Sequence, residues 1–240
     1  MLVTFVDVET TGLAPETDRI VEIAVALVDV SEKRLMRAFS SLTQAEDNSI
    51  KITPKLQELH GISQKALDRN GVPHAGILNF IFQNYVSKSD HICAHNAPFD
   101  KAFVDAELVR SALEPWAMNW LDSRTDLPFS DNIQSRSLKY LACEHGFLYD
   151  AHSALNDVLA MAKIFCQYDH NKTAELVTSP YAHLYHQSSF EDKALQAKLK
   201  EVGFHWDRQK KLWKKTLRSN QLEEELKRLT ARGLTPKQNL

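Results

Sequence analysis

The sequence predicts an α/β fold, a mixed sheet flanked by helices, followed by a small basic α+β module. Three observations predict it. Apolar, β-branched runs come first, and segments with helical periodicity then alternate with short strands. Residues 1–190 carry 16 Lys and Arg against 24 Asp and Glu, whereas residues 191–240 carry 13 against 7. The chain of 240 residues is long enough for one large domain and a small appendage.

Composition excludes several classes of protein. Hydrophobic residues make up 43% of the chain and charged residues 25%, so it is not disordered, collagenous or a coiled coil. The apolar stretches are too short to span a bilayer, and we expect no signal peptide after Met1. Cys93, Cys143 and Cys166 lack CxxC spacing, which predicts buried thiols in a reduced, cytoplasmic protein.

Five strands are predicted in the larger part of the chain. Leu2–Val8 alternates and is rich in β-branched residues, as is typical of a strand. Ile20–Val30 and Leu35–Leu42 follow after short links, so we expect these three strands to form an antiparallel meander. The fourth and fifth candidates are His91–His95 and Trp116–Leu121.

Helical signals follow the meander. Thr53 is a helix cap, Pro54 suits the first helical position, and Gly61 ends this short helix. The amphipathic pattern of Ala75–Val86 predicts a second helix. Three more helices are expected, at Phe99–Leu113, Ser137–His145 and Leu155–Tyr168.

Residues 1–170 are therefore expected to form one domain. The polar stretch 171–192 predicts a linker, and residues 193–240 predict a hairpin followed by a helix at Gln221–Arg232. The net charge of +6 over residues 191–240 indicates contact with a polyanion. A solvated basic surface explains that charge equally well.

Two acids on the first strand indicate chemistry. Asp7 and Glu9 are two residues apart, so both side chains point to the same face of the sheet. Burying two neighbouring carboxylates is costly unless a positive group compensates, and no Lys or Arg is near in sequence. A divalent cation is the natural compensator. Alternatively, the strand ends in solvent and both acids are simply exposed.

Two later segments add further candidates. Asp100 falls at the start of a predicted helix, where an acid also complements the helix dipole. Ser153 is a plausible helix cap, which places His152 just outside the next helix and Asp157 in its first turns. Because the other residues of that helix are mostly apolar, Asp157 needs a partner.

These residues resemble the motifs of the DEDDh 3′–5′ exonucleases, the DnaQ-like superfamily that includes proofreading subunits, RNase T and oligoribonuclease. Asp7 and Glu9 stand in a DxETTG motif, Asp100 in HNAxFD, and His152 with Asp157 in HxAxxD. The resemblance covers about residues 2–168. Supporting segments are His60-Gly61-Ile62, Leu121-Asp122-Ser123 and Ser137–Gly146.

The resemblance implies a ribonuclease H-like fold with a mixed five-stranded sheet, and catalysis with two Mg²⁺ or Mn²⁺ ions. Asp7, Glu9 and Asp157 would hold one ion, and Asp7 would also touch a second ion that Asp100 supports. His152 would take a proton from the attacking water. The products would be nucleoside 5′-monophosphates released from a 3′ end.

The resemblance also suggests contacts with the terminal nucleotide. Backbone amides of Thr10–Gly12 would contact it and Leu13 would wedge against its base, unless this is an ordinary turn. His60 either meets the same nucleotide or merely ends a helix, and Asn96 either orients the scissile phosphate or caps a turn. The candidate substrate contacts are Thr10, Thr11, Gly12, Leu13, His60, Asn96 and Phe99.

The basic carboxyl-terminal module offers a second nucleic-acid surface. Tryptophans can stack on bases while lysines meet phosphates. The spacing is distantly similar to the annealing-helicase HARP repeat. Alternatively, both tryptophans form the core of a small domain and the lysines only solvate it. The candidate residues are Trp206, Lys210, Lys211, Trp213, Lys214 and Lys215.

The leading hypothesis is a metal-dependent 3′–5′ exonuclease that acts on DNA in repair or nucleic-acid turnover. The expected partner is a nucleic acid with a free 3′ end, with no membrane contact, and the chain is either a monomer or a homodimer. The alternatives are an exoribonuclease, a polymerase proofreading subunit and an inactive nucleic-acid-binding module. A nucleotide-binding dehydrogenase is excluded, because no GxGxxG follows the first strand.

Overall fold

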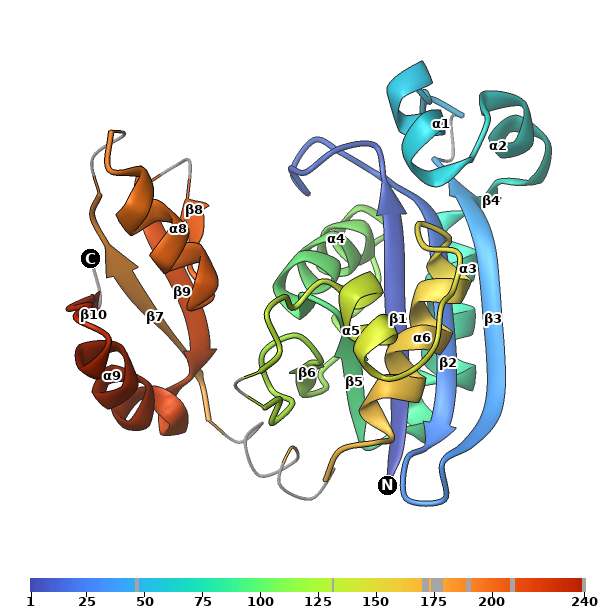
Figure 1. The fold of residues 1–240 in the computed structure, drawn as a ribbon. Helices are drawn as coiled ribbons and strands as arrows, with labels where there is room; N and C mark the ends of the chain where they lie inside the picture. The colour runs from blue at the N-terminus through green and yellow to red at the C-terminus, as the bar shows by residue number, and fades with distance from the viewer. Residues whose placement is uncertain are drawn as a thin grey trace. The chain divides into compact units, whose positions relative to one another are not determined.

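The amino end of the chain folds into the predicted antiparallel meander. β1 (Leu2–Thr10) pairs with β2 (Ile20–Asp29), and β2 pairs with β3 (Arg34–Gln44). β1 lies inside the sheet rather than at its edge (Figure 1). This computed structural model describes residues 1–45, 48–130, 132–169, 173, 179–188, 191–207 and 210–238.

Parallel strands extend the meander on both sides. β5 (His91–Ala94) pairs with β1, β6 (Trp120–Asp122) pairs with β5, and β4 (Val72–Pro73) pairs with β3. In the described part of the chain, the mixed sheet has six strands in the order β4-β3-β2-β1-β5-β6. The sequence predicted five, because a two-residue strand with a proline carries no strand pattern. The strand predicted from Trp116 begins only at Trp120, and Trp116 itself is buried in the core.

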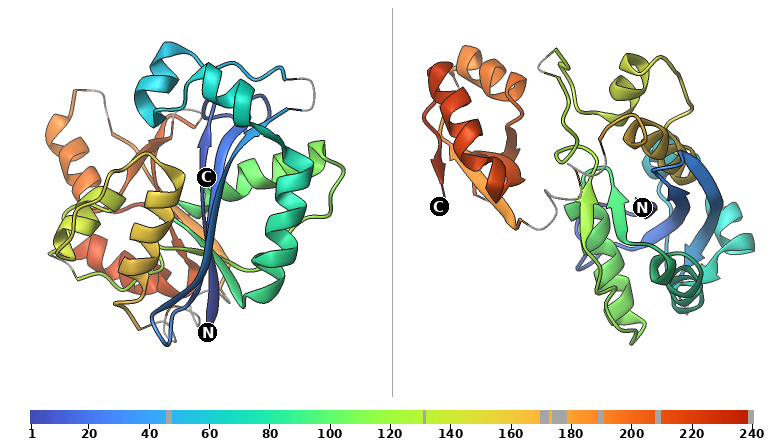
Figure 2. Two further views of the ribbon diagram at one scale, coloured as in Figure 1. Left: turned by 90° about the vertical axis from the view of Figure 1, so that its right-hand side faces the viewer. Right: turned by 90° about the horizontal axis from the view of Figure 1, so that it is seen from below.

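Helices cover both faces of this sheet, as Figure 2 (left) shows. α3 (His74–Asn84) and α4 (Ala97–Arg110) lie on one face. α5 (Leu138–Glu144) and α6 (Ala154–Phe165) lie on the other. All four helices were predicted, with ends that differ by a few residues.

Two short helices follow β3. α1 (Pro54–His60) begins where predicted, because the Thr53 hydroxyl accepts a hydrogen bond from the Leu56 amide at 3.3 Å. It ends at Gly61, whose φ of 74° is the left-handed conformation that glycine adopts readily. α2 (Gln64–Asn70) was not predicted from the sequence.

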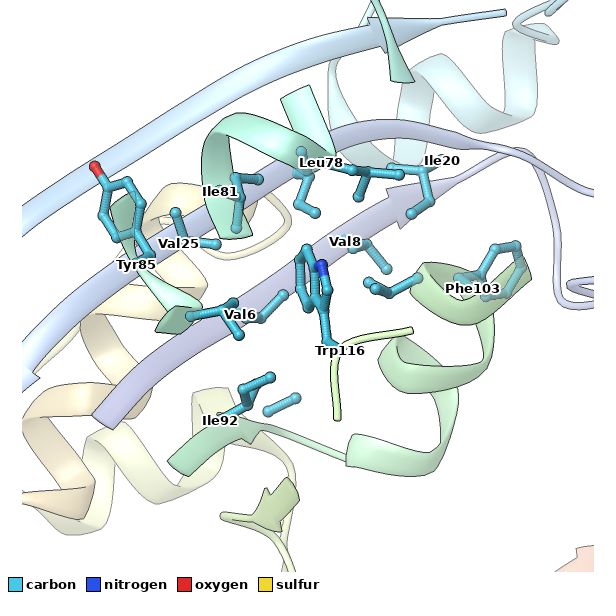
Figure 3. Packing of buried hydrophobic residues seen from close by; sticks show 14 of the residues in the cluster. Val6, Val8, Ile20, Val25, Leu78, Ile81, Tyr85, Ile92, Phe103 and Trp116 are labelled. Atoms are coloured by element: carbon cyan, nitrogen blue, oxygen red, sulfur yellow. The ribbon is translucent and has the colours of Figure 1, made fainter. Parts of the chain in front are cut away.

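The alternation along β1 separates the core from the acids. Val6 and Val8 face α3 and α4 and pack with Leu78, Ile81 and Phe103 (Figure 3). The intervening residues face α6, where the ring centroid of Phe5 lies 5.3 Å from that of Phe165. Asp7 and Glu9 therefore share the α6 face of the sheet.

A second compact unit lies at the carboxyl end. The first unit comprises Met1–Leu127 and Arg136–His170, and the second comprises Pro128–Ser135 and Asn171–Leu240. The second unit has a sheet in the order β10-β7-β9-β8, packed against α8 and α9. Its elements are β7 (Tyr181–His186), α8 (Lys193–Glu201), β8 (His205–Asp207), β9 (Leu212–Arg218), α9 (Leu222–Ala231) and β10 (Lys237–Gln238).

One expectation for this region changes. The β8–β9 hairpin and the helix after it are present. Interpreting 171–192 as a linker is wrong for Tyr181–His186, because β7 pairs with both β9 and β10 inside the sheet. Several remaining positions of that stretch lie outside the described residues.

The cysteines also differ from expectation. Cys93 is buried, but Cys166 is half-buried and Cys143 is exposed, and each is a free thiol. In the described parts of the chain, no helix is long and apolar enough to cross a bilayer.

Candidate active site

Three predicted acids come together on the α6 face of the sheet. Asp7 and Glu9 come from β1, and Asp157 comes from the first turn of α6. Each offers a carboxylate oxygen, and these atoms lie within 4.8 Å of one another. Oxygen donors at this spacing suit a hard divalent cation. The alternative that the β1 acids are simply exposed to solvent is wrong.

Asp100 approaches the same strand from α4. The register of β1 with β5 ends at Phe5, so the amide of Val8 has no strand partner on that side. Asp100 is 3% exposed, and its Oδ1 accepts a hydrogen bond from the Val8 amide at 3.2 Å. Asp100 thus lies beside the strand between Asp7 and Glu9.

Asp157 is held by the segment before its own helix. Its Oδ1 accepts a hydrogen bond from the Tyr149 hydroxyl at 2.6 Å, and its Oδ2 accepts one from the His152 amide at 2.9 Å. His152 has a φ of 69°, in the left-handed region, and its side chain is exposed. The main chain of His152 is therefore fixed to an acid of the cluster while its imidazole faces solvent.

Burial and mutual repulsion raise the pKa values of these acids. Burial raises the pKa of Asp7 well above its ordinary value, and the carboxylates of Asp100 and Asp157 raise it further. Burial, with Asp157 and Glu22, raises the pKa of Glu9 to about 7. The pKa values of Asp100 and Asp157 are raised as well, mainly by burial. Such a cluster holds protons unless a cation compensates its charge.

Glu22 is an acid of this site that the sequence reasoning missed. It lies directly opposite Glu9 in the β1–β2 pair. Its Oε1 accepts a hydrogen bond from the Ser40 hydroxyl at 2.8 Å, and its Oε2 accepts one from the Ala154 amide at 3.3 Å. Ser153 makes no side-chain cap, so Glu22 supports the start of α6 instead. The available signal was one acid inside an apolar strand.

Asp122, at the end of β6, organises the second motif. Its Oδ1 accepts hydrogen bonds from the amides of Asn96 and Arg124, both at 2.9 Å. His95 is fixed nearby, with Nδ1 2.9 Å from the Ser123 hydroxyl and Nε2 2.7 Å from the carbonyl of Arg136. Burial raises the pKa of Asp122 to about 6 and lowers that of His95 to about 4. These bonds fix the turn from which α4 and Asp100 begin.

Asn96 and Phe99 lie on that turn. Asn96 occupies the cap position of α4 with a φ of 82°, yet its side chain makes no capping hydrogen bond. Its side chain is exposed, as the substrate role requires. Phe99 packs at the edge of the core, with its ring centroid 4.8 Å from that of Phe103.

The loop after β1 has a defined internal structure. The Thr10 hydroxyl donates to the carbonyl of Gly12 at 2.6 Å, and the Thr11 hydroxyl accepts from the Arg19 amide at 2.9 Å. A Cβ on Gly12 would lie 2.3 Å from the Asp18 carboxylate, so only glycine fits without displacing it. Leu13 is 81% exposed, as expected of a side chain that meets a ligand.

A buried ion pair supports this loop from the opposite face of the sheet. Glu107 on α4 is fully buried, and Arg19 contacts both of its carboxylate oxygens, at 2.7 and 3.0 Å. Arg110 lies 3.2 Å from the same carboxylate and donates to the carbonyl of Pro15. The loop is thus anchored to α4 at Pro15, in its middle, and at Arg19, at its end.

His60, the last residue of α1, is 6% exposed. Its Nδ1 accepts a hydrogen bond from the Ile62 amide at 3.1 Å, whereas its buried Nε2 has no partner. Burial lowers the pKa of His60, and the nearby charge of Glu22 opposes that shift. His60 is thus a buried helix-end residue with one unpaired ring nitrogen.

The predicted tail residues divide into two groups. Trp213 is 4% exposed and packs in the core of the second unit, so it does not stack on bases. Lys215 contacts Glu225 at 2.8 Å. Trp206 is 45% exposed, and its ring packs edge-on against that of Trp213.

The three other lysines remain nearer to solvent. Lys210 and Lys211 have exposed side chains, and that of Lys214 is half-buried. Lys210 Nζ lies 3.2 Å from the Tyr185 hydroxyl and over its ring, 4.5 Å from the centroid. In the described part of this unit, the exposed aromatic and basic candidates are therefore Trp206, Lys210 and Lys211.

A mixed sheet with a partly buried cluster of carboxylates beside an exposed histidine defines a hydrolase of the nuclease type. The family model described as Exonuclease, RNase_T, matches residues 4–165. The chain therefore belongs to the DEDDh exonuclease family, and it is a 3′–5′ exonuclease by membership.

Proteins with similar sequences support this family assignment. Ribonuclease T of Buchnera aphidicola subsp. Baizongia pistaciae (strain Bp) is 32% identical over 181 residues, which cover 68% of this chain and 81% of the relative. DNA polymerase III PolC-type of Staphylococcus epidermidis strain ATCC 35984 is 27% identical over 176 residues, which cover 66% of this chain but 11% of the polymerase.

Two solved structures share the fold. Exonuclease I of E. coli, in complex with a dA13 oligonucleotide, has a TM-score of 0.60 and 20% identity, over 74% of this chain and 43% of that chain. The nuclease domain of 3'hExo, a DEDDh family member bound to rAMP, has a TM-score of 0.57 and 20% identity, over 69% and 90%. The ribonuclease H-like fold expected from the sequence is confirmed.

Proposed function

We propose that this protein is a two-metal-ion-dependent 3′–5′ exonuclease that shortens DNA from the 3′ end and releases nucleoside 5′-monophosphates. The convergence of Asp7, Glu9 and Asp157 within 4.8 Å, with Asp100 beside them, supports this proposal. Their raised pKa values fit a site that exchanges protons for divalent cations.

The proposed roles follow the positions of the acids. Asp7, Glu9 and Asp157 would hold one Mg²⁺ or Mn²⁺. Asp7 would also contact a second ion, and Asp100 would support that ion. Bound cations supply Lewis acidity for the attacking water and the leaving oxygen. His152 takes the proton of that water, because its imidazole is exposed at the edge of the cluster while its main chain is fixed to Asp157.

The 3′-terminal nucleotide is proposed to bind at the loop after β1. Leu13 is exposed there, and Gly12 leaves the loop backbone open to close approach. His60, the last residue of α1, is proposed to contact the same nucleotide, as the motif resemblance implies. Asn96 and Phe99 on the turn before α4 complete the proposed contacts.

RNA is the second candidate substrate. The observation that favours it is the similarity to a ribonuclease T at 32% identity over most of that relative. The two solved neighbours contain a DNA oligonucleotide and rAMP respectively. DNA is the first candidate substrate, and the proposed role is in DNA repair or nucleic-acid turnover in the cytoplasm.

The second unit is proposed to grip the nucleic-acid strand. The exposed Trp206 can stack on a base, and Lys210 and Lys211 can meet phosphates. The net charge of +6 over residues 191–240 favours the same kind of partner.

A substrate panel tests the proposed function. Purified protein is incubated with single strands of DNA and of matched RNA, labelled at the 5′ or the 3′ end, in Mg²⁺, Mn²⁺ or EDTA. We expect 5′-labelled DNA to shorten stepwise, 3′-labelled DNA to release mononucleotides at once, and EDTA to stop both. If RNA is shortened faster than DNA, RNA is the substrate instead of DNA. If neither is shortened but both still bind, the protein is a nucleic-acid-binding module.

A further inference from the structure

Asp157 has a hydrogen-bond donor on each of its carboxylate oxygens. The Tyr149 hydroxyl donates to Oδ1 at 2.6 Å, and the His152 amide donates to Oδ2 at 2.9 Å. Both donors come from one short segment before α6. The carboxylate is therefore fixed in rotation as well as in position.

The ring of Tyr149 is itself held in place. It is half-buried, and its centroid lies 6.5 Å from that of Phe147. Lys163 on α6 lies over the Phe147 ring, 4.1 Å from the centroid. The Tyr149 ring thus lies beside Phe147, and its hydroxyl reaches Asp157 on α6.

The backbone of His152 binds Asp157 at the other end of this segment. A φ of 69° at His152 is unusual for a residue other than glycine, and the amide of this residue points at Asp157. The segment Tyr149–His152 is thus bound at both ends to one carboxylate. Asp157, an acid of the proposed metal site, is thus hydrogen-bonded to the backbone of His152, the proposed proton acceptor.

We propose that Tyr149 is a positioning residue of the metal site, whose hydroxyl orients the Asp157 carboxylate for a divalent cation. The inference rests on the proposed function, since it takes Asp157 as a metal ligand. Groups that hydrogen-bond to metal ligands typically change metal affinity by about 10- to 100-fold when removed. Tyr149 lies outside the motifs that revealed the acids, and only the folded chain brings its hydroxyl to Asp157.

Tyr149→Phe removes the hydroxyl and keeps the ring. Tyr168→Phe is the matched control, because Tyr168 is also an aromatic hydroxyl bound to a neighbour, 2.8 Å from His145 Nε2 and away from the acids. Binding of Mn²⁺ to the full chain is measured by calorimetry without nucleic acid. We expect an affinity about 10-fold weaker in Tyr149→Phe and unchanged in Tyr168→Phe.

Two further measurements separate positioning from a general structural role. In EDTA, the urea midpoint of Tyr149→Phe should stay close to that of Tyr168→Phe. In Asp157→Asn, adding Tyr149→Phe should weaken Mn²⁺ binding no further, because the hydroxyl acts through that carboxylate.

Equal Mn²⁺ affinity in wild type and Tyr149→Phe would overturn the proposal and leave the proposed function standing. An equal further loss in the Asp157→Asn background would also overturn it. Failure of the wild type to bind Mn²⁺ would contradict the metal site itself, and with it the proposed function.

Discussion

Glu9 on β1 and Glu22 on β2 lie directly opposite each other in the antiparallel pair. Like charges at such positions repel, and Glu22 contributes to the raised pKa of both Glu9 and Asp7. The fold tolerates this arrangement because Glu22 accepts hydrogen bonds from Ser40 and from the amide of Ala154. The charge of the site thus extends beyond the motif acids.

Replacing Glu22 with glutamine should lower the pKa of Glu9. Glu22→Gln removes a negative charge from the opposite strand while keeping the length of the side chain. Carbon-detected NMR of the Glu9 carboxyl, in EDTA, follows the shift. Glu58→Gln is the control, since Glu58 is exposed on α1. An unchanged titration of Glu9 in Glu22→Gln would contradict the electrostatic coupling.

The Glu9 carboxyl should make the metal-free protein less stable as pH rises. Its pKa is about 7 in the fold and 4.5 for an ordinary glutamate, so between these values the folded state binds the proton more tightly. The contribution of this carboxyl to the free energy of unfolding is fully present below about pH 4.5 and is lost as pH rises through about 7.

Comparison with Glu9→Gln isolates that contribution from the buried histidines, whose lowered pKa values act in the opposite direction. In EDTA, the unfolding free energy of Glu9→Gln should gain about 2 kcal/mol over wild type between pH 5 and 8, after allowance for partial exposure. Urea unfolding at both pH values measures it. A difference that is independent of pH would show that Glu9 is not protonated in the fold.

His152→Asn should reduce turnover by about 10²- to 10⁴-fold, because it removes the proton acceptor. Asparagine tolerates the left-handed backbone at this position, so the amide bond to Asp157 should survive. Mn²⁺ affinity should therefore match wild type. His186→Asn, in the second unit, should leave single-turnover rates unchanged. A rate for His152→Asn near that of wild type would remove His152 from the mechanism.

The two tryptophans of the β8–β9 hairpin should respond differently. Trp213→Ala should destabilise the second unit by about 3–5 kcal/mol, because it empties a core position. Trp206→Ala removes an edge-on contact with Trp213, so it should lower the urea midpoint much less than Trp213→Ala. It should weaken binding of a single-stranded oligonucleotide by about 1–3 kcal/mol. Fluorescence anisotropy in EDTA measures that binding. Unchanged affinity in Trp206→Ala would restrict the substrate contacts to the first unit.

The alternation of β1 explains why its acids could be predicted from sequence. A period of two places Asp7 and Glu9 on one face whatever surrounds the strand, so only their depth of burial was open. Asp100 lies in one later segment, and His152 and Asp157 lie in another; the motif resemblance joined them to the β1 acids. The fold then confirmed the convergence of Asp7, Glu9 and Asp157.

Glu22 and Tyr149 depend on tertiary geometry. The position of Glu22 opposite Glu9 requires the register of β1 with β2, which a single strand pattern does not give. The hydrogen bond from Tyr149 to Asp157 joins residues eight apart and depends on the fold of the segment between them. The local sequence around Glu22 offered only an acid inside an apolar strand, and its partners came from the fold.

Two features of the carboxyl-terminal unit also could not be predicted from the sequence. β7 lies within a polar stretch and is a strand only because β9 and β10 pair with it. Trp206 and Trp213 are directly opposite each other in the hairpin, yet β8 is an edge strand, so Trp206 is 45% exposed and Trp213 is 4% exposed. Strand alternation alone gives both residues the same environment.

The most direct test of the proposed site is Asp7→Asn, measured on a 5′-labelled single strand in saturating Mg²⁺ or Mn²⁺. Asp7 is half-buried among repelling acids, so the neutral isostere should unfold in EDTA at the same or a higher urea concentration than wild type. We expect the stepwise ladder from the 3′ end to disappear in Asp7→Asn and to persist in Glu58→Gln. A folded Asp7→Asn that shortens the strand at a rate near that of wild type would contradict the assignment of this cluster as the active site.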